Sequence, residues 1–361
     1  MTVAGASDGP SDRTFVQKVS LTTAIILGSL IFLVLLWQAF TILLLVYASV
    51  VLAVPLAALT DLVHRRARLH RTVALILVVL VVSALIAGAA TLLTPVIEKQ
   101  AKRLGEELPG AVDQFESRLD RSWLGRRILD EVQNPRKIVT RAVDLSRMAG
   151  WLYSAVGIGL GIVFVAALAV YLAAEPGLYV GGILRLLPPE RRARSREVLH
   201  EMRVVLLRWL VGQGISMLVL GVLTSLMLWA TGVPLALILG LFVAIMTFIP
   251  ILGPIIASVP VLLLAAAEGV STFLIVALLY LGIQQLEGNF LTPMIHRARI
   301  ALPPVMILAV QLVLARLVGF LGILMAMPLV AIGMVAVRML WVEDVLGEVD
   351  DDVPKPGGAG T

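Results

Sequence analysis

The second half of this chain is almost wholly apolar, yet proline and glycine interrupt it at two corresponding places. The first interruption is residues 249–254, Ile-Pro-Ile-Leu-Gly-Pro, and the second is residues 318–322, Val-Gly-Phe-Leu-Gly. Each lies between apolar stretches of about 13 to 16 residues, and a helix of that length reaches only ~20–24 Å. The hydrocarbon core of a bilayer is about 30 Å thick, so these stretches are too short to cross it comfortably. Paired, broken apolar helices are typical of the substrate sites of transporters.

The composition excludes an ordinary soluble domain. Hydrophobic residues make up 59% of the 361 residues and charged residues only 15%, and several separate apolar runs approach or exceed the length of a membrane span. We therefore expect an all-α polytopic membrane protein with about six full transmembrane helices, two broken-helix pairs, and an amphipathic helical segment outside the membrane. Each broken pair is either a re-entrant hairpin, which the short length of its helices favours, or two tilted crossings. The isoelectric point near 9.8 is better explained by basic cytoplasmic loops than by nucleic-acid binding, which we do not expect.

The sequence pattern divides the chain into five parts. Residues 1–18 are expected to be a cytosolic tail, and residues 19–94 to hold three transmembrane helices, at about 19–37, 39–59 and 72–93. Residues 95–148 carry apolar side chains at helical spacing and predict extracytoplasmic amphipathic helices, with a break or kink at Pro109-Gly110. Residues 149–340 form the transport region, with a basic loop at 175–208 and broken helices at 235–264 and 304–338. Residues 341–361 predict a disordered acidic tail.

Two basic loops give the expected orientation. Four arginines lie in the short loop that ends at Arg71, and the loop at 175–208 also has an excess of arginine. Positive loops stay in the cytoplasm, so both termini are expected there. The abundance of alanine, valine, glycine and arginine suggests a bacterial protein of the cytoplasmic (inner) membrane.

Few charges are expected at membrane depth, and such charges are functional by default. Glu287 either lines a path or marks a helix end that meets the cytoplasm. Arg316, three residues before Gly319, either pairs with Glu287, holds an anionic solute, or extends to water from a shallow tip. The expected path residues are polar or helix-breaking and lie in or shortly before the two interruptions and in the polar segment between them: Thr247, Pro250, Gly253, Pro254, Gln284, Glu287, Asn289, Pro293, Gln311, Arg316, Gly319 and Gly322.

Hairpins that enter from opposite sides would bring the two tips together near the middle of the membrane. The halves also share a faint local repeat, because residues 252–260 resemble residues 321–328 with one residue dropped. No catalytic constellation, cofactor-binding motif or metal-ligand spacing is present, so we expect neither an enzyme nor a cofactor nor a metal site.

Three segments give the chain a family resemblance. They are residues 248–254 (Phe-Ile-Pro-Ile-Leu-Gly-Pro), residues 287–293 (Glu-Gly-Asn-Phe-Leu-Thr-Pro) and residues 319–328 (Gly-Phe-Leu-Gly-Ile-Leu-Met-Ala-Met-Pro). In order, spacing and layout the chain resembles the autoinducer-2 exporter (AI-2E) family of bacterial inner-membrane permeases. The resemblance implies export of a small polar solute, such as a quorum-sensing signal, or ion exchange, and assembly as a homo-oligomer such as a pentamer. Arg316 departs from the family pattern, which has a small or apolar residue there.

The leading hypothesis is a secondary transporter that exports a small polar solute, with a proton or sodium gradient as one driving force and the hairpin tips as gates. One alternative is a cation/proton antiporter or channel, for which Glu287 is the titratable candidate. The other is a membrane scaffold without transport activity, for which residues 95–148 would be the partner surface.

Overall fold

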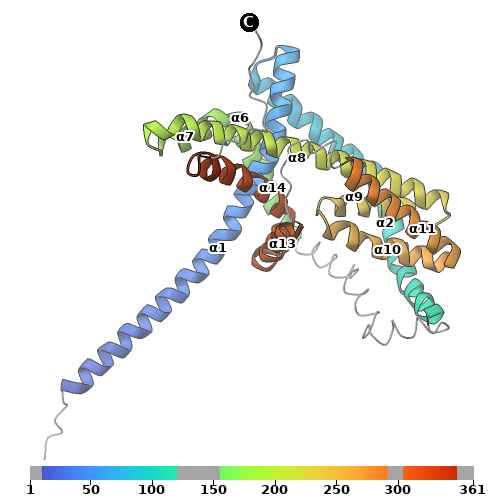
Figure 1. Cartoon of the computed structure of the whole chain (residues 1–361), viewed down its shortest axis with the longest axis horizontal. Helices are drawn as coiled ribbons and strands as arrows, with labels where there is room; N and C mark the ends of the chain where they lie inside the picture. The colour runs from blue at the N-terminus through green and yellow to red at the C-terminus, as the bar shows by residue number, and fades with distance from the viewer. Residues whose placement is uncertain (1–9, 120–154, 292–303, 348–361) are drawn as a thin grey trace, which may run out of the picture. The chain divides into compact units, whose positions relative to one another are not determined.

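The computed structural model describes residues 10–119, 155–291 and 304–347 of the chain (Figure 1). The chain separates into two units, residues 1–47 and 48–361. Within the described ranges every regular element is a helix and there is no β-strand, which confirms the all-α fold. Among the residues that the structure describes, five helices are long and apolar enough to cross a membrane, or six if one bent pair counts as a span. The second amphipathic stretch, Pro293 and the acidic tail beyond residue 347 lie outside the described residues.

The N-terminal spans form longer helices than the sequence pattern indicates. Helix α1 runs without a break over Pro10–Ala67, where two spans with a boundary near Gln38 were expected. No proline or glycine stands at that boundary, so nothing there ends a helix. Because the turn between two crossings is not seen, the cytoplasmic N-terminus stays a prediction. A short connection with Arg68 at φ 53° then leads to helix α2.

Helix α2 covers Arg71–Leu119 and joins the third expected span to the first amphipathic stretch. It continues through Pro95 and through Pro109-Gly110, where a break or kink was expected. A proline removes one backbone donor but need not end a helix that packs against neighbours. Helix α2 does pack on helices α10 and α9, so the amphipathic stretch extends the third span instead of starting a separate element.

The central part of the chain has helices on both sides of the first interruption, and the loop expected at 175–208 is largely helical. Helix α6 is Ala155–Ala174 and helix α7 is Pro176–Arg185, bent from α6 by 82°. Helix α8, Pro189–Ala230, joins the charged loop to the fifth span as one helix of 42 residues. Helix α11, Val270–Leu286, is the sixth span and continues into the π-helix η1, Glu287–Leu291.

Both interruptions separate pairs of helices, as the proline and glycine pattern predicts. The first pair is α9, Ala236–Thr247, and α10, Leu252–Glu268. The second is α13, Pro304–Val318, and α14, Phe320–Val337, which continues into the π-helix η2, Arg338–Glu343. The two helices of each pair pack against each other. With η2, α14 is long enough to cross a membrane, whereas α9, α10 and α13 are shorter apolar helices.

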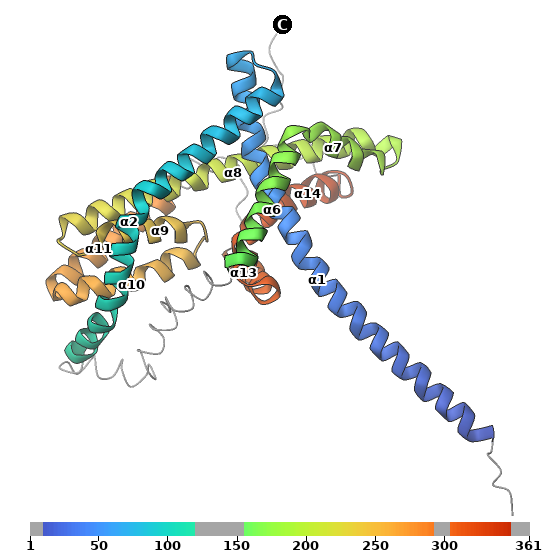
Figure 2. The ribbon, with the colours of Figure 1, turned by 180° about the vertical axis from the view of Figure 1, so that it is seen from behind.

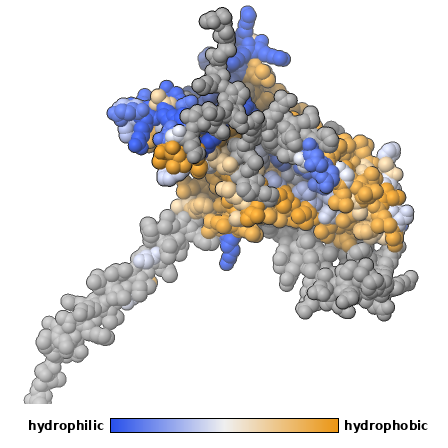
Figure 3. All heavy atoms as spheres, in the orientation of Figure 1, coloured by the Kyte–Doolittle hydropathy of each residue, from blue (hydrophilic) through white to orange (hydrophobic). Residues whose placement is uncertain are grey.

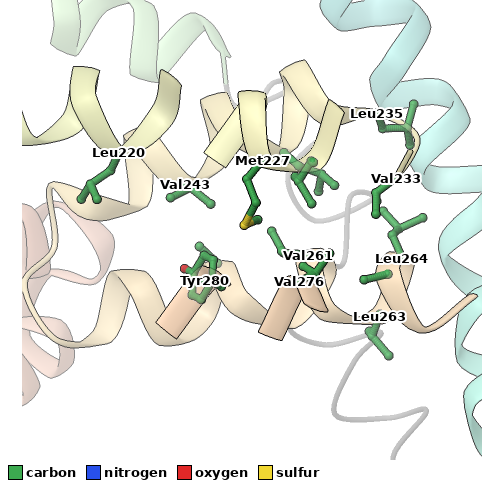
Figure 4. Close-up of a cluster of buried hydrophobic side chains, with 14 residues drawn as sticks. Leu220, Met227, Val233, Leu235, Val243, Val261, Leu263, Leu264, Val276 and Tyr280 are labelled. Atoms are coloured by element: carbon green, nitrogen blue, oxygen red, sulfur yellow. The ribbon is translucent and has the colours of Figure 1, made fainter. Parts of the chain in front are cut away.

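The largest buried cluster lies where α8 meets the first pair and α11, and Figures 1 and 2 both show these helices side by side. Leu220, Leu239, Val243, Val261 and Val276 are fully buried there, and Figure 4 shows α8, α9, α10 and α11 supplying its side chains. Small residues allow close packing of α8 on α9, since a Cβ on Gly240 would overlap Ser225. Many large apolar side chains instead face outward (Figure 3), as expected of a surface in lipid.

Candidate transport site at the first helix break

The first break is a short, strained turn. Helix α9 ends at Thr247 and α10 begins at Leu252. Pro250 has no backbone N–H and cannot continue a helix. Ile251 has φ 69° and ψ −61°, and the Leu252 N–H donates to the Pro250 carbonyl at 2.8 Å. These values describe a γ-turn with positive φ, which is rare and strained for a β-branched residue. Strain of this kind is found at functional and switch sites.

Side chains from three other helices donate to backbone carbonyls in and beside this break. The Gln213 amide of α8 donates to the Thr247 carbonyl at 2.6 Å, and the Gln311 amide of α13 donates to the Pro250 carbonyl at 3.3 Å. The Tyr280 hydroxyl of α11 donates to the Pro254 carbonyl at 2.9 Å. Backbone groups freed inside a membrane need partners within the protein or in a water-filled cavity. In this conformation the three side chains are therefore the hydrogen-bond partners of these carbonyls.

These polar side chains are buried in apolar surroundings. Thr247 is 2% exposed, Gln213 6% and Gln311 0%. The Thr247 hydroxyl donates to the Val243 carbonyl one turn earlier, at 2.8 Å. The Gln311 Oε1 atom has no hydrogen-bond partner among the described residues. A buried acceptor of this kind costs free energy, so Gln311 is the polar group of the site with unused bonding capacity.

Glycine allows each broken pair to close tightly. A Cβ on Gly253, near the start of α10, would overlap the Met246 carbonyl of α9. A Cβ on Gly322, near the start of α14, would overlap the Leu314 carbonyl of α13 in the same way. The two segments that resemble each other in sequence thus use glycine for the same close approach. Gly319 itself, at φ 71° and ψ −142°, forms the second break, a conformation that side chains strongly disfavour.

The first break meets the side of α13 and not its tip. Gln311 lies eight residues before Gly319, which is about 12 Å along a helix. This hydrogen bond therefore joins the first tip to the body of the second pair. We expected the two pairs to approach each other, but we expected the contact to join their tips.

The polar segment after α11 forms a second group. Glu287 begins the π-helix η1 and is half-buried, and π-helical turns are frequent at functional sites. The buried Gln284 Nε2 atom has no partner in the described ranges, while the Asn289 amide donates to Gln285 Oε1 at 3.1 Å. Arg316 is exposed. No ion pair joins it to Glu287 within the described part of the chain, so the anticipated pairing is not formed here.

Comparison with known proteins gives the family. The sequence model of the AI-2E family of transporters matches residues 25–340. The chain belongs to the AI-2E transporter family. It is 32% identical over 165 residues to YrrI of Bacillus subtilis, an alignment that covers 46% of this chain and 47% of that relative. It is 22% identical over 278 residues to YueF of the same organism, covering 73% of this chain and 75% of the relative. A Synechocystis relative is 28% identical over 238 residues, 66% of each chain. All three carry names that describe candidate transport proteins.

Membership of the AI-2E family, together with the apolar helices, makes this chain a multi-pass membrane protein of a transporter family. The sequence analysis identified Thr247, Pro250 and Gln311 as site residues, and the structure brings them to one break. It missed Gln213 and Tyr280. The available signal was a polar side chain within an apolar run, since Gln213 stands in the apolar part of α8. Their partners are 34 and 26 residues away, and nothing in the sequence pairs them.

Proposed function

We propose that this AI-2E family protein is a secondary transporter that exports a small polar solute across the bacterial inner membrane by alternating access of its two helical hairpins. The observation that carries the proposal is the part-buried hydrogen bond from Gln311 of the second pair to the Pro250 carbonyl of the first. It joins the two broken pairs at a strained turn. In this proposal the first break is a gate, and the hydrogen bond from Gln311 holds it in the conformation seen here. We also propose that both termini lie in the cytoplasm.

The hydrogen-bonding groups at the break fit a hydroxylated solute. Carbonyls of residues 247, 250 and 254 accept hydrogen bonds from neutral donors, and an amide or hydroxyl donor can be exchanged for a solute hydroxyl at small net cost. The unused Gln311 Oε1 atom could accept from the same solute. No charged side chain contacts these carbonyls among the described residues. We therefore propose a neutral polyhydroxylated solute, such as an autoinducer-2-like signal or a related metabolite.

Export of autoinducer-2 from cells tests this proposal. The variant Gln311→Leu keeps the volume of the side chain but removes both hydrogen-bonding atoms. Thr91→Ala is a matched control, because Thr91 is exposed and bonds only the Gly88 carbonyl of its own helix. We expect cells with the Thr91 variant to accumulate the signal outside as the native chain does, and cells with the Gln311 variant to lose most of that activity. Equal export by both variants would overturn the proposal.

The alternative of a cation/proton antiporter rests on Glu287. Its half-buried carboxylate in a π-helix, beside the unpartnered amide of Gln284, is the arrangement that favours ion exchange. Proteoliposomes with an internal pH-sensitive dye and an imposed sodium gradient separate the two functions. If Glu287→Gln abolishes a proton flux that the native chain carries while Gln311→Leu leaves it intact, the protein is an antiporter.

The scaffold alternative rested on the amphipathic segment as a partner surface. Part of that segment already has a partner within the chain. Gln100 of α2 accepts a hydrogen bond from the Ile238 N–H in the first turn of α9 at 2.9 Å, and α2 packs on α10. We therefore favour a role in supporting the first pair. Assembly as a homo-oligomer, such as a pentamer, stays a prediction.

A further inference from the structure

Helix α7 leaves the end of a membrane-spanning helix at nearly a right angle. Helix α6 has 20 residues, about 30 Å, which matches the thickness of the hydrocarbon core. Glu175 then adopts φ −132° and ψ 63°, and Pro176 starts α7 at a bend of 82°. A proline at this position prevents α6 from continuing. If α6 crosses the bilayer, α7 lies close to the plane of its surface.

One face of α7 is apolar and has no neighbour within the described part of the chain. Leu178 is 64% exposed, Ile183 52% and Leu186 86%, with Tyr179 between them at 38%. At 100° per residue these four side chains cover a single sector of the helix. Leu184, at 2% exposure, points the other way, toward the side on which α7 packs against α8. The exposed sector therefore lies on the side of α7 that faces away from α8.

Arginines flank this apolar face. Residues 175–196 contain five arginines and two glutamates, and four arginines remain against these two glutamates once Arg194, which pairs with Glu343 and Asp344, is set aside. Arg192 of α8 donates to the carbonyls of Leu187 and Arg185, at 3.1 and 3.3 Å, and so lies over the end of α7 next to Leu186. Arg185 and Arg191 are exposed. Figure 3 has the orientation of Figure 1, and at the upper left, where Figure 1 labels α7, hydrophilic residues lie beside hydrophobic ones.

We propose that α7 is an interfacial helix that inserts its apolar face into the membrane and binds anionic phospholipid headgroups through the adjoining arginines. Three observations favour a lipid surface as the occupant: the 82° bend from a bilayer-length helix, the apolar face, and the excess of positive charge at its edge. An apolar helix face with basic flanks binds anionic membranes. The proposal does not depend on which solute the protein moves.

Lipid-specific quenching tests it on the full chain. The sequence has no cysteine, so a fluorophore can be attached to Leu186→Cys alone. The labelled protein is placed in bilayers of phosphatidylcholine and phosphatidylglycerol in equal parts, with one or the other lipid brominated. A label at Leu85→Cys on α2, a residue 67% exposed in an apolar run, serves as the control for ordinary lipid contact.

We expect brominated phosphatidylglycerol to quench the Leu186 label at least ~2-fold more than brominated phosphatidylcholine, because the adjoining arginines attract anionic headgroups. The Leu85 label should be quenched equally by both. The double variant Arg185→Gln/Arg191→Gln, which keeps the Arg192 bonds, should remove the excess and leave the Leu186 label in contact with lipid. Equal quenching by both lipids in the native background would overturn the proposal. Absence of quenching, with the label in water or against a second copy of the chain, would also overturn it.

Discussion

The side-chain amide of Gln311 donates to the Pro250 carbonyl at 3.3 Å, and this contact joins the two broken helix pairs. Gln311 is completely buried. The same carbonyl also accepts the Leu252 N–H at 2.8 Å within the γ-turn. Removal of Gln311 would therefore free the turn from α13 without leaving the carbonyl unpaired, which makes this contact suited to break and re-form during a transport cycle.

The hydrogen bond from Gln213 holds the other side of the break. Because the Thr247 carbonyl is buried and lies at the end of α9, Gln213→Leu leaves an acceptor unsatisfied and should cost about 1–3 kcal/mol of unfolding free energy. Ser258→Ala is the control, since the exposed Ser258 hydroxyl bonds only the Ile255 carbonyl of its own helix. The stability of the two variants is measured by unfolding them in detergent, with circular dichroism as the signal. Equal unfolding midpoints for the two variants would show that the Gln213 hydrogen bond is not made.

The glycines of the two breaks should not tolerate a methyl group. Gly253→Ala and Gly322→Ala each place a Cβ against a backbone carbonyl of the preceding helix, and overpacking of this kind costs about 1–3 kcal/mol. Gly282→Ala on α11 meets no atom within 4 Å and should gain up to ~1 kcal/mol from helix propensity. Thermal unfolding of the three variants is the measurement. Destabilisation by Gly282→Ala alone would contradict the packing described here.

Ion pairs join the π-helix η2, which continues α14, to the start of α8. Arg194 of α8 contacts Glu343 at 2.6 Å and Asp344 at 3.0 Å, and it donates to the Met339 carbonyl at 3.0 Å. In a double-mutant cycle, Arg194→Ala and Glu343→Ala should show a coupling energy of about 0.5–1 kcal/mol, the range of partly exposed pairs. The coupling should shrink in 1 M salt. A coupling that does not change with salt would argue against an ion pair.

Gln100 acts as a cap for α9 supplied by another helix. The Leu235 backbone before α9 is left-handed and provides no side-chain cap, so the Ile238 N–H depends on Gln100 Oε1. Gln100→Leu should cost about 1 kcal/mol, as the loss of other caps does, and should speed hydrogen exchange in the first turn of α9. Gln100→Glu keeps an acceptor near a helix N-terminus and should preserve protection. Identical hydrogen-exchange rates in the Gln100→Leu and Gln100→Glu variants would contradict the hydrogen bond between Gln100 and the Ile238 N–H.

Much of the fold could be predicted from local sequence. The two breaks fall where Pro250 and Gly319 interrupt apolar runs, because proline and glycine act on the backbone at their own positions. Helix ends without such residues were harder to place. The boundary expected at Gln38 is absent, since a polar residue alone does not stop a helix.

The site was predictable only in part. Gln311 was identified as a polar residue five positions before Arg316, close to the second break. Its acceptor, 61 residues away in sequence, is set by how α13 packs on the first break. The Arg316 prediction treated two charges as partners because both were expected at membrane depth. Arg316 instead lies on the exposed side of α13, and no ion pair holds it among the residues that the structure describes.

The central claim is that the first break is a gate held by Gln311, and the accessibility of Ile251 tests it most directly. Ile251→Cys in the cysteine-free chain is labelled with a membrane-impermeant maleimide from each side of sealed vesicles, with Gln311 intact or replaced by leucine. Loss of a hydrogen bond worth about 1 kcal/mol multiplies an open population about five-fold. The account predicts a labelling rate that rises by about that factor in Gln311→Leu, while an exposed control cysteine at Ala193 is unchanged. Equal Ile251 labelling rates in the two backgrounds would contradict it.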